Sequence, residues 1–494
     1  MEQPVNSGGW SIFTTEIGLV ALSLGCLVLD IFIPSDEKKG KLLAAVAMAG
    51  VAGLFANLCL GWQHFGSAFG GSFAQDGLAF FFKLLFLLAG FFALFMAKSY
   101  QNHLERGRGE FILLILFSLT GLSVLASASD FLLLFVSIET LTVSLVIMTA
   151  YLRKENRSIE AGLKYLILGA ISTALFLYGL SFIYGATGST SYAEIGQKLA
   201  GQARPLSPPF LFGMALVISS LGFKIAAVPF QLWTPDIYEG APTPVTAYLA
   251  MASKAAGFAA LLRLMLTVFG PAQGVLIVLF AGLSALTILY GNLGAIPQTN
   301  IKRLLGYSSI GHAGYLLVGL AAFSHAGKEA LLFYLLSYLF STAGAFLVIV
   351  AVSSHLKNDE ISGYAGLSQK SPLLAAGMLL ALLSLAGVPP LGGFFAKFYL
   401  LWAGMRAGFL WLVVIGVLNV ITSLYYYLKI VKTMYIDKPA SAPSSDGTKL
   451  ELTLSQKTIQ YFSIAGILVL GIWQEPFVRL VEQVFLLTSG NGLR

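Results

Sequence analysis

Charged residues are scarce in this sequence. Asp, Glu, Lys and Arg make up 11% of its 494 residues, hydrophobic residues make up 57%, and the mean hydropathy is +0.81. Soluble domains carry about 25% charged residues, so the composition excludes an ordinary soluble domain. The net charge of +7 is not clustered as in a nucleic-acid-binding surface, and no nucleic acid is expected as a partner.

Cysteine is almost absent too. Cys26 and Cys59 lie in the first two apolar runs without CxxC spacing, which argues against a zinc or iron–sulfur site. The sequence also lacks a Walker loop and a GxGxxG motif after a strand. We therefore expect no metal and no cofactor in this chain.

Long apolar runs are what the sequence has instead. Each is about 20 residues long, enough to cross a ~30 Å hydrocarbon layer as a helix, and the dyad alternation of barrel strands is missing. The expected fold is an all-α, polytopic membrane protein, because helices satisfy their own backbone groups in lipid. The N-terminus lacks a basic n-region, so the first run is expected to be a retained helix. The fourteen predicted spans are approximately 11–33, 42–62, 77–98, 110–128, 130–152, 160–186, 209–230, 243–269, 274–293, 301–322, 328–353, 372–404, 408–436 and 458–487.

Lys and Arg residues outside the predicted membrane interior predict the orientation. Loops after odd-numbered spans hold 18 of them and the opposite side holds 7, which places both termini outside by the positive-inside rule. The seven are Lys198, Arg204, Arg263, Lys328, Arg406, Arg479 and Arg494.

Several ionisable residues remain inside predicted spans. A lysine at the centre of a membrane helix costs roughly 2.5–3.5 kcal/mol on insertion scales, so a functional role is the first interpretation. These residues are Lys83, Lys164, Lys224, Lys254, Lys397, Glu16, Asp30, Glu139 and His312.

Some of these residues have simpler explanations. Lys83, Glu16 and Asp30 lie near span ends, where side chains can reach the interface. Lys164 could pair with Glu160, one turn earlier, and a lone histidine such as His312 is often merely hydrogen-bonded. Glu139, Lys224, Lys254 and Lys397 lie too deep for these explanations, and a histidine can also relay protons.

Helix breakers accompany two of the deep lysines. Lys224 lies five residues before Pro229, and Lys397 follows Pro389 and Pro390 in LAGVPPLGGFFAKFY. Proline removes a helical hydrogen bond, and in membranes such breaks occur where protein or a water-filled cavity satisfies the backbone. Broken seventh and twelfth helices beside buried lysines are typical of intramembrane ion sites.

Equal spacings suggest an internal repeat. Glu139 and Lys224 are 85 residues apart, as are His312 and Lys397. We therefore predict two inverted five-helix repeats, and the predicted division of the chain is 1–109, 110–269, 270–436 and 437–494. The offset of 173 residues also relates Lys254 to Tyr427 and Lys164 to Ser337.

Specific motifs carry a resemblance to a known family. GFKIAAVPFQLWTPDIYEGAPTPVTAYLA, SIETLTVSLVIM and QTNIKRLLGYSSIGHAGYLLVGL resemble the antiporter-like membrane subunits of respiratory complex I, the NADH–quinone oxidoreductase. DIYEGAPTPV is similar to the subunit N form. Lys397 differs from the glutamate typical of subunit M, and the length leaves no room for the long lateral helix of subunit L.

The resemblance implies roles for individual residues. Glu139 and Lys224 would form an acid–lysine pair that Lys164 modulates, Lys254 would be the central relay, and His312 would connect to the exit-side Lys397. The implied partners are M- and K-type subunits and the peripheral arm, which would hold flavin, iron–sulfur clusters, NADH and quinone. The implied location is the bacterial inner membrane, and the chain would belong to a proton-translocating enzyme without holding its redox site.

Three other functions stay open at this point. Related chains occur in multi-subunit cation/proton antiporters and in membrane-bound hydrogenases. A purely structural membrane scaffold is a further alternative, which the depth of Lys254 disfavours.

Overall fold

The computed structural model describes residues 9–62, 64–200, 206–353, 359–438, 450 and 452–490. Arg204 and Arg494, two of the seven basic residues predicted on the outer side, lie outside these residues. Much of the predicted polar segment 437–457 does so as well. By its internal contacts the chain divides into two compact units. Unit 1 comprises residues 1–225, 252–275 and 480–494, and unit 2 comprises 226–251 and 276–479.

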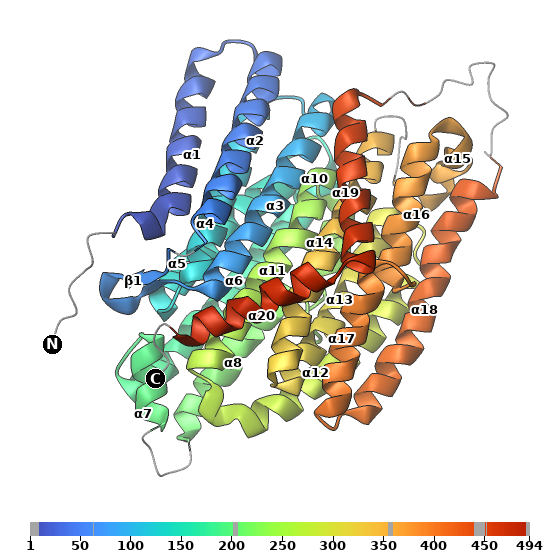
Figure 1. Cartoon of the computed structure of the whole chain (residues 1–494). Helices are drawn as coiled ribbons and strands as arrows, with labels where there is room; N and C mark the ends of the chain where they lie inside the picture. The colour runs from blue at the N-terminus through green and yellow to red at the C-terminus, as the bar shows by residue number, and fades with distance from the viewer. Residues whose placement is uncertain are drawn as a thin grey trace. The chain divides into compact units, whose positions relative to one another are not determined.

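The described residues are almost entirely helical, as predicted (Figure 1). The strands are β1 (Gly66–Ala68) and β2 (Phe73–Gln75), an antiparallel pair. The helices of unit 1 are α1 (Thr14–Phe32), α2 (Asp36–Leu60), α3 (Gly77–Tyr100), α4 (Arg108–Ser127), α5 (Phe131–Thr149), α6 (Asn156–Thr187), α7 (Tyr192–Ala200), α8 (Pro208–Ile225) and α11 (Lys254–Thr267).

Unit 2 holds most of the remaining helices. They are α9 (Trp233–Gly240), α10 (Thr243–Tyr248), α13 (Ile301–Ala322), α14 (His325–Ser353), α15 (Leu367–Lys370), α16 (Pro372–Ala386), α17 (Gly392–Arg406), α18 (Leu410–Tyr435) and α19 (Leu454–Ile472). Three elements run from one unit into the other: a π-helical turn (Leu249–Ser253) between α10 and α11, α12 (Gln273–Ala295) and α20 (Glu475–Gly490).

Helix starts follow local sequence signals. Asp76, Asp130 and Asn300 precede α3, α5 and α13, and each side chain accepts a hydrogen bond from a backbone N–H of the first turn. Thr453 and Gln456 form a capping box at the start of α19. Such caps satisfy donors that a helix leaves unpaired.

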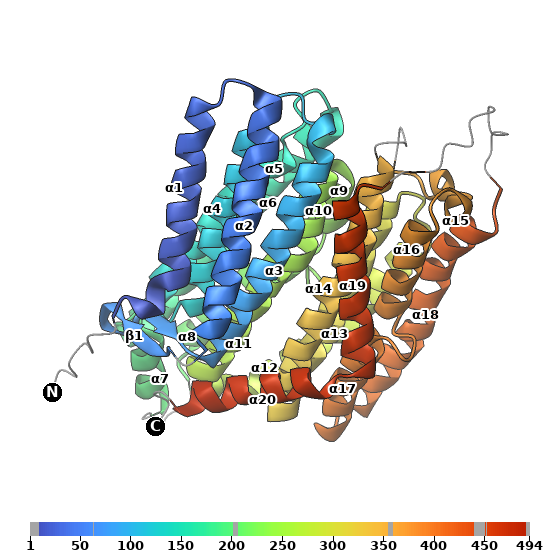
Figure 2. The same cartoon turned by 45° about the horizontal axis from the view of Figure 1, so that its top comes forward.

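Twelve described spans are long and apolar enough to cross a membrane, or thirteen if the bent pair of α19 and α20 counts as one. The predicted number of fourteen is therefore not confirmed. The last predicted span, 458–487, is wrong as one continuous helix, because α19 and α20 meet at an angle of 81° (Figure 2). The hydropathy of the segment is continuous, but the chain turns at Trp473 and Gln474.

Both predicted helix breaks are present. The first separates α8 from α9 at residues 226–232, and the second separates α16 from α17 at residues 387–391. Lys224 precedes its break, whereas Lys397 follows its break. The breaks start 161 residues apart (387 − 226), so the predicted offset of 173 residues does not superimpose them. The repeat and the four-part division remain predictions.

Candidate proton-relay site

In unit 1, Lys224 reaches across to α5. It is the second-last residue of α8 and is buried, and its ammonium donates a 2.5 Å hydrogen bond to Thr142 Oγ1. The Thr142 hydroxyl donates in turn to the carbonyl of Ile138 at 2.6 Å. The Lys224 ammonium also lies 5.8 Å from the centre of the Tyr165 ring. A hydroxyl and an aromatic face therefore surround the charge.

Glu139 lies one turn before Thr142 on α5 and is half-buried. Its Oε1 accepts a 2.7 Å hydrogen bond from Thr173 on α6. Within the described part of the chain, no ion pair of 4.0 Å or less joins Glu139 to Lys224. Lys224 on α8 thus bonds the α5 residue one turn beyond Glu139, and the two charges stay apart.

Lys164 pairs with Glu160, as the sequence allowed. Their side chains form a 2.7 Å ion pair one turn apart on α6, and the Lys164 side chain is 41% exposed. Its helix packs against both α5 and α8. Lys164 is therefore beside the Glu139 and Lys224 helices without being deeply buried.

Lys254 is the first residue of α11 and is buried directly after the π-helical turn. Such turns are rare and often lie at functional sites. Gly257, one turn later, packs against α8: a Cβ there would lie 3.3 Å from Lys224 Cβ. Since Lys254 and Gly257 are three residues apart on one helix, they share a face, and α11 passes close beside Lys224.

In unit 2, His312 on α13 is buried among tyrosines. Its Nδ1 lies 2.6 Å from Tyr334 Oη, and its Nε2 lies 3.2 Å from Tyr427 Oη. Tyr427 Oη also hydrogen-bonds Ser308 Oγ. Both ring nitrogens therefore have hydroxyl partners that can accept or donate a proton.

Lys397 on α17 shares a small cavity with His312. The Lys397 ammonium donates to the Ala386 carbonyl at 3.0 Å and lies 4.9 Å from the centre of the Tyr315 ring. The cavity has room for a water-sized molecule and is lined by polar groups. Its polar lining is His312, Tyr334, Ser337, Tyr338, Ser341, Ser384 and Lys397.

Sequence reasoning missed most of these hydroxyl groups. Tyr334, Ser337, Tyr338 and Ser341 lie on α14 at spacings i, i+3, i+4 and i+7. This spacing puts them on one face of a helix, and a polar stripe in an otherwise apolar span was a readable signal.

Two further expectations need correction. Lys83 does not extend to the interface: it is 1% exposed and forms a 2.7 Å ion pair with Glu16. Arg263 is not a loop residue but is buried on α11, where it pairs with Asp76. Asp30, by contrast, lies at the end of α1 and pairs with Lys39 at 3.3 Å. Local hydropathy could not reveal the Glu16–Lys83 and Asp76–Arg263 pairs, because in each pair the partners are distant in sequence.

The described residues contain no group of three or more His, Cys, Asp or Glu side chains arranged to hold a metal.

Known proteins resemble this chain over nearly its whole length. Residues 128–423 match the family model "NADH:quinone oxidoreductase/Mrp antiporter, TM". The chain is 41% identical over 482 residues to the NADH-quinone oxidoreductase subunit N of Desulforamulus reducens, covering 97% of this chain and 99% of that one. It belongs to the NADH–quinone oxidoreductase subunit N family.

Solved structures agree with this membership. A chain of respiratory complex I from Thermus thermophilus with bound aureothin is 33% identical, with a TM-score of 0.79 and coverage of 95% of this chain and 99% of that one. A chain of the Mrp complex from a Dietzia species is 21% identical, with a TM-score of 0.83 and 96% coverage of each. The likeness to the Mrp chain shows a shared fold.

Proposed function

We propose that this member of the subunit N family is a proton-translocating membrane-arm subunit of an NADH–quinone oxidoreductase. Its membership in the family supports this, and the 41% identity to a named subunit N favours it over the antiporter and hydrogenase alternatives. The observation that carries the proposal is the set of ionisable side chains buried inside membrane-spanning helices. Such residues are costly in lipid and mark ion pathways.

Glu139 and Lys224 form the switch of the first half of the relay. A carboxylate stabilises a neighbouring ammonium, whereas burial alone favours the neutral amine. When Lys224 moves from Thr142 towards Glu139, it holds its proton, and when it returns to Thr142, it can pass the proton on. We call the switch open when Lys224 bonds Thr142 and closed when it lies against Glu139. The 2.5 Å bond to Thr142 supports the open state.

Lys254 receives the proton of Lys224 in this scheme. The close packing of α8 on α11 at Gly257 supports it, because proton transfer needs donor and acceptor within hydrogen-bond reach, directly or through one water. Lys164 modulates the switch from the neighbouring α6.

His312 and Lys397 form the second half. Their shared cavity is lined by hydroxyls, and Ser341 donates to Ser384 at 2.8 Å along its wall. Hydroxyl groups and a water can carry a proton between the imidazole and the amine. Lys397 is then the exit-side group.

The assembly and orientation belong to the same proposal. Neighbours of the M and K types would supply the driving conformational change, and the peripheral arm would hold flavin, iron–sulfur clusters, NADH and quinone. The excess of Lys and Arg in the odd-numbered loops supports both termini on the outer side of a bacterial inner membrane.

Substitutions of the switch test the function. Lys224→Ala and Glu139→Ala, each in the complex assembled with its own partner subunits, should largely abolish proton pumping driven by NADH. Pumping would be followed in inverted membrane vesicles with a pH-sensitive dye. Wild-type pumping in both variants would disprove the proposed function.

A further inference from the structure

A second acid–lysine pair lies in unit 1, away from the relay residues. Lys83 Nζ on α3 is 2.7 Å from Glu16 Oε1 on α1, and the two side chains are 1% and 9% exposed. The pair lies at one end of the helices: Glu16 is in the first turn of α1, and Lys83 is in the second turn of α3. α4 ends beside it with Ser123 and Ser127.

The two carboxylate oxygens of Glu16 differ in their hydrogen bonds. Glu16 Oε1 accepts from both Lys83 and Ser123, the latter at 2.6 Å. Lys83 also donates to Gln75 Oε1 at 2.5 Å, and that oxygen accepts from Ser127 at 3.4 Å. The other carboxylate oxygen, Glu16 Oε2, is buried and accepts no hydrogen bond from any described residue. A proton can therefore bind at Oε2 without breaking an existing bond.

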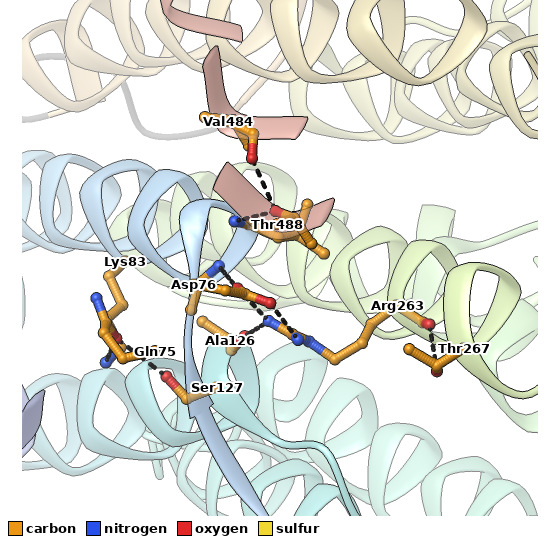
Figure 3. Close-up of polar contacts among 11 residues, drawn as sticks. Gln75, Asp76, Lys83, Ala126, Ser127, Arg263, Thr267, Val484 and Thr488 are labelled. Carbon is orange, nitrogen blue, oxygen red and sulfur yellow. Dashed lines mark hydrogen bonds and ion pairs between the residues drawn. The ribbon is translucent and has the colours of Figure 1, made fainter. Parts of the chain in front are cut away.

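Two further charges near Lys83 form an ion pair of their own, Asp76 with Arg263. Figure 3 shows Arg263 between Asp76 and the Ala126 carbonyl, and Gln75 between Lys83 and Ser127. Arg263 donates to both Asp76 oxygens at 2.9 Å, and Asp76 Oδ1 also accepts from Ala79 N–H at 2.8 Å. Both Asp76 oxygens thus accept hydrogen bonds, whereas Glu16 Oε2 accepts none from the described residues.

A structural role alone is a poor explanation of the Glu16–Lys83 pair. Replacing a buried ion pair with apolar residues is often neutral or stabilising, so a scaffold has no need of it in a membrane. Ionisable groups at such positions mark sites of function. The free oxygen supplies a specific chemistry, the reversible binding of a proton.

We propose that Glu16 and Lys83 form an additional proton-binding site of this subunit. One proton binds at Glu16 Oε2, giving a neutral carboxylic acid beside the Lys83 ammonium, and the same proton later leaves; no other bond forms or breaks. In the orientation proposed above, the α1, α3 and α4 ends that hold the site face the outer side, so the site serves proton release. This last step rests on the proposed function.

The experiment compares single and double variants in the assembled complex. Glu16→Gln and Lys83→Met each remove one charge, and the double variant removes both while leaving no unpaired buried charge. The exposed pair Glu37 and Lys41 on α2, 2.6 Å apart, provides the matched control Glu37→Gln/Lys41→Met. The measurements are protons pumped per NADH oxidised and the infrared band of a protonated carboxylic acid in turnover-minus-rest difference spectra.

The expected result is a carboxylic acid band that disappears in Glu16→Gln and in the double variant. The double variant should also pump fewer protons per NADH than the control. A double variant that pumps as the wild type does and retains the band would overturn the proposal, because a merely structural pair predicts that outcome. Ser123→Ala keeps both charges and should shift the band, so the proposal stays testable if the charge variants fail to assemble. Pumping in Lys224→Ala, measured in the same vesicles, separates a failure of the proposed function from a failure of this site.

Discussion

The Lys224 ammonium is held by the hydroxyl of Thr142, one turn beyond Glu139 on the same helix. The hydroxyl both accepts from Lys224 and donates to Ile138, so it stabilises the separated state of the acid and the lysine. The balance between Thr142 and Glu139 as partners of Lys224 then sets how readily the lysine gives up its proton.

Thr142→Val should slow coupled turnover. It removes the hydroxyl but keeps the side-chain shape, so Lys224 loses its acceptor and moves towards Glu139. A hydrogen bond to a charged group contributes about 1.5–3 kcal/mol, which corresponds to roughly a 10- to 100-fold change in the open-to-closed ratio. NADH–quinone turnover and pumping rate in vesicles measure the effect. Thr140→Val is the matched control, since Thr140 is exposed and its hydroxyl donates to the Val136 carbonyl. An equal loss in both variants would contradict the role of Thr142.

Gly257→Ala should disturb the packing between α8 and α11. The added methyl would lie 2.5 Å from Ile225 Cγ2 and 3.3 Å from Lys224 Cβ, and overpacking costs about 1–3 kcal/mol. We expect lower thermal stability together with lower pumping, measured by thermal unfolding in detergent and by vesicle assay. Gly185→Ala on α6 is the control, because no described atom beyond its own stretch of helix lies within 4 Å of its Cβ position. Unchanged behaviour of Gly257→Ala would show that the close approach is unimportant.

The Asp76–Arg263 pair should stabilise unit 1 strongly. Asp76→Asn keeps the cap of α3, since asparagine caps as well as aspartate, but leaves Arg263 buried without its counter-ion. Breaking a buried pair in this way costs about 3–5 kcal/mol. Adding Arg263→Met should recover much of that stability. A double-mutant cycle on thermal unfolding checks this, and additive losses would refute the coupling.

Tyr334→Phe should impair the second half of the relay. The variant removes the hydroxyl 2.6 Å from His312 Nδ1 and one polar group of the cavity shared with Lys397. Positioned proton-transfer groups contribute about 10²–10⁴-fold, and we expect pumping to fall towards the lower end of that range. Tyr315→Phe is the matched control. It keeps the ring beneath Lys397 and removes a hydroxyl that bonds the Gly416 carbonyl. If both variants pump alike, the hydroxyl of Tyr334 is not part of the relay.

The relay could be predicted only in part. The deep positions of Lys224, Lys254, His312 and Lys397 followed from hydropathy, and all four are buried. Their partners did not follow, because Thr142 and Tyr427 lie 82 and 115 residues from Lys224 and His312, respectively. Lys224 and Lys397 lie on opposite sides of their helix breaks, and the repeat inferred from the equal 85-residue spacings stays a prediction.

The sequence alone determined the membrane fold, the two helix breaks and the depth of Lys224, Lys254, His312 and Lys397. These depend on local composition, because lipid requires every helix to satisfy its own backbone and penalises each charge at its own position. Which charges on different helices face each other was decided only by the tertiary structure. Glu16 meets Lys83, and Asp76 meets Arg263 across 187 residues, since helix packing sets these contacts and no pattern within a single span encodes them.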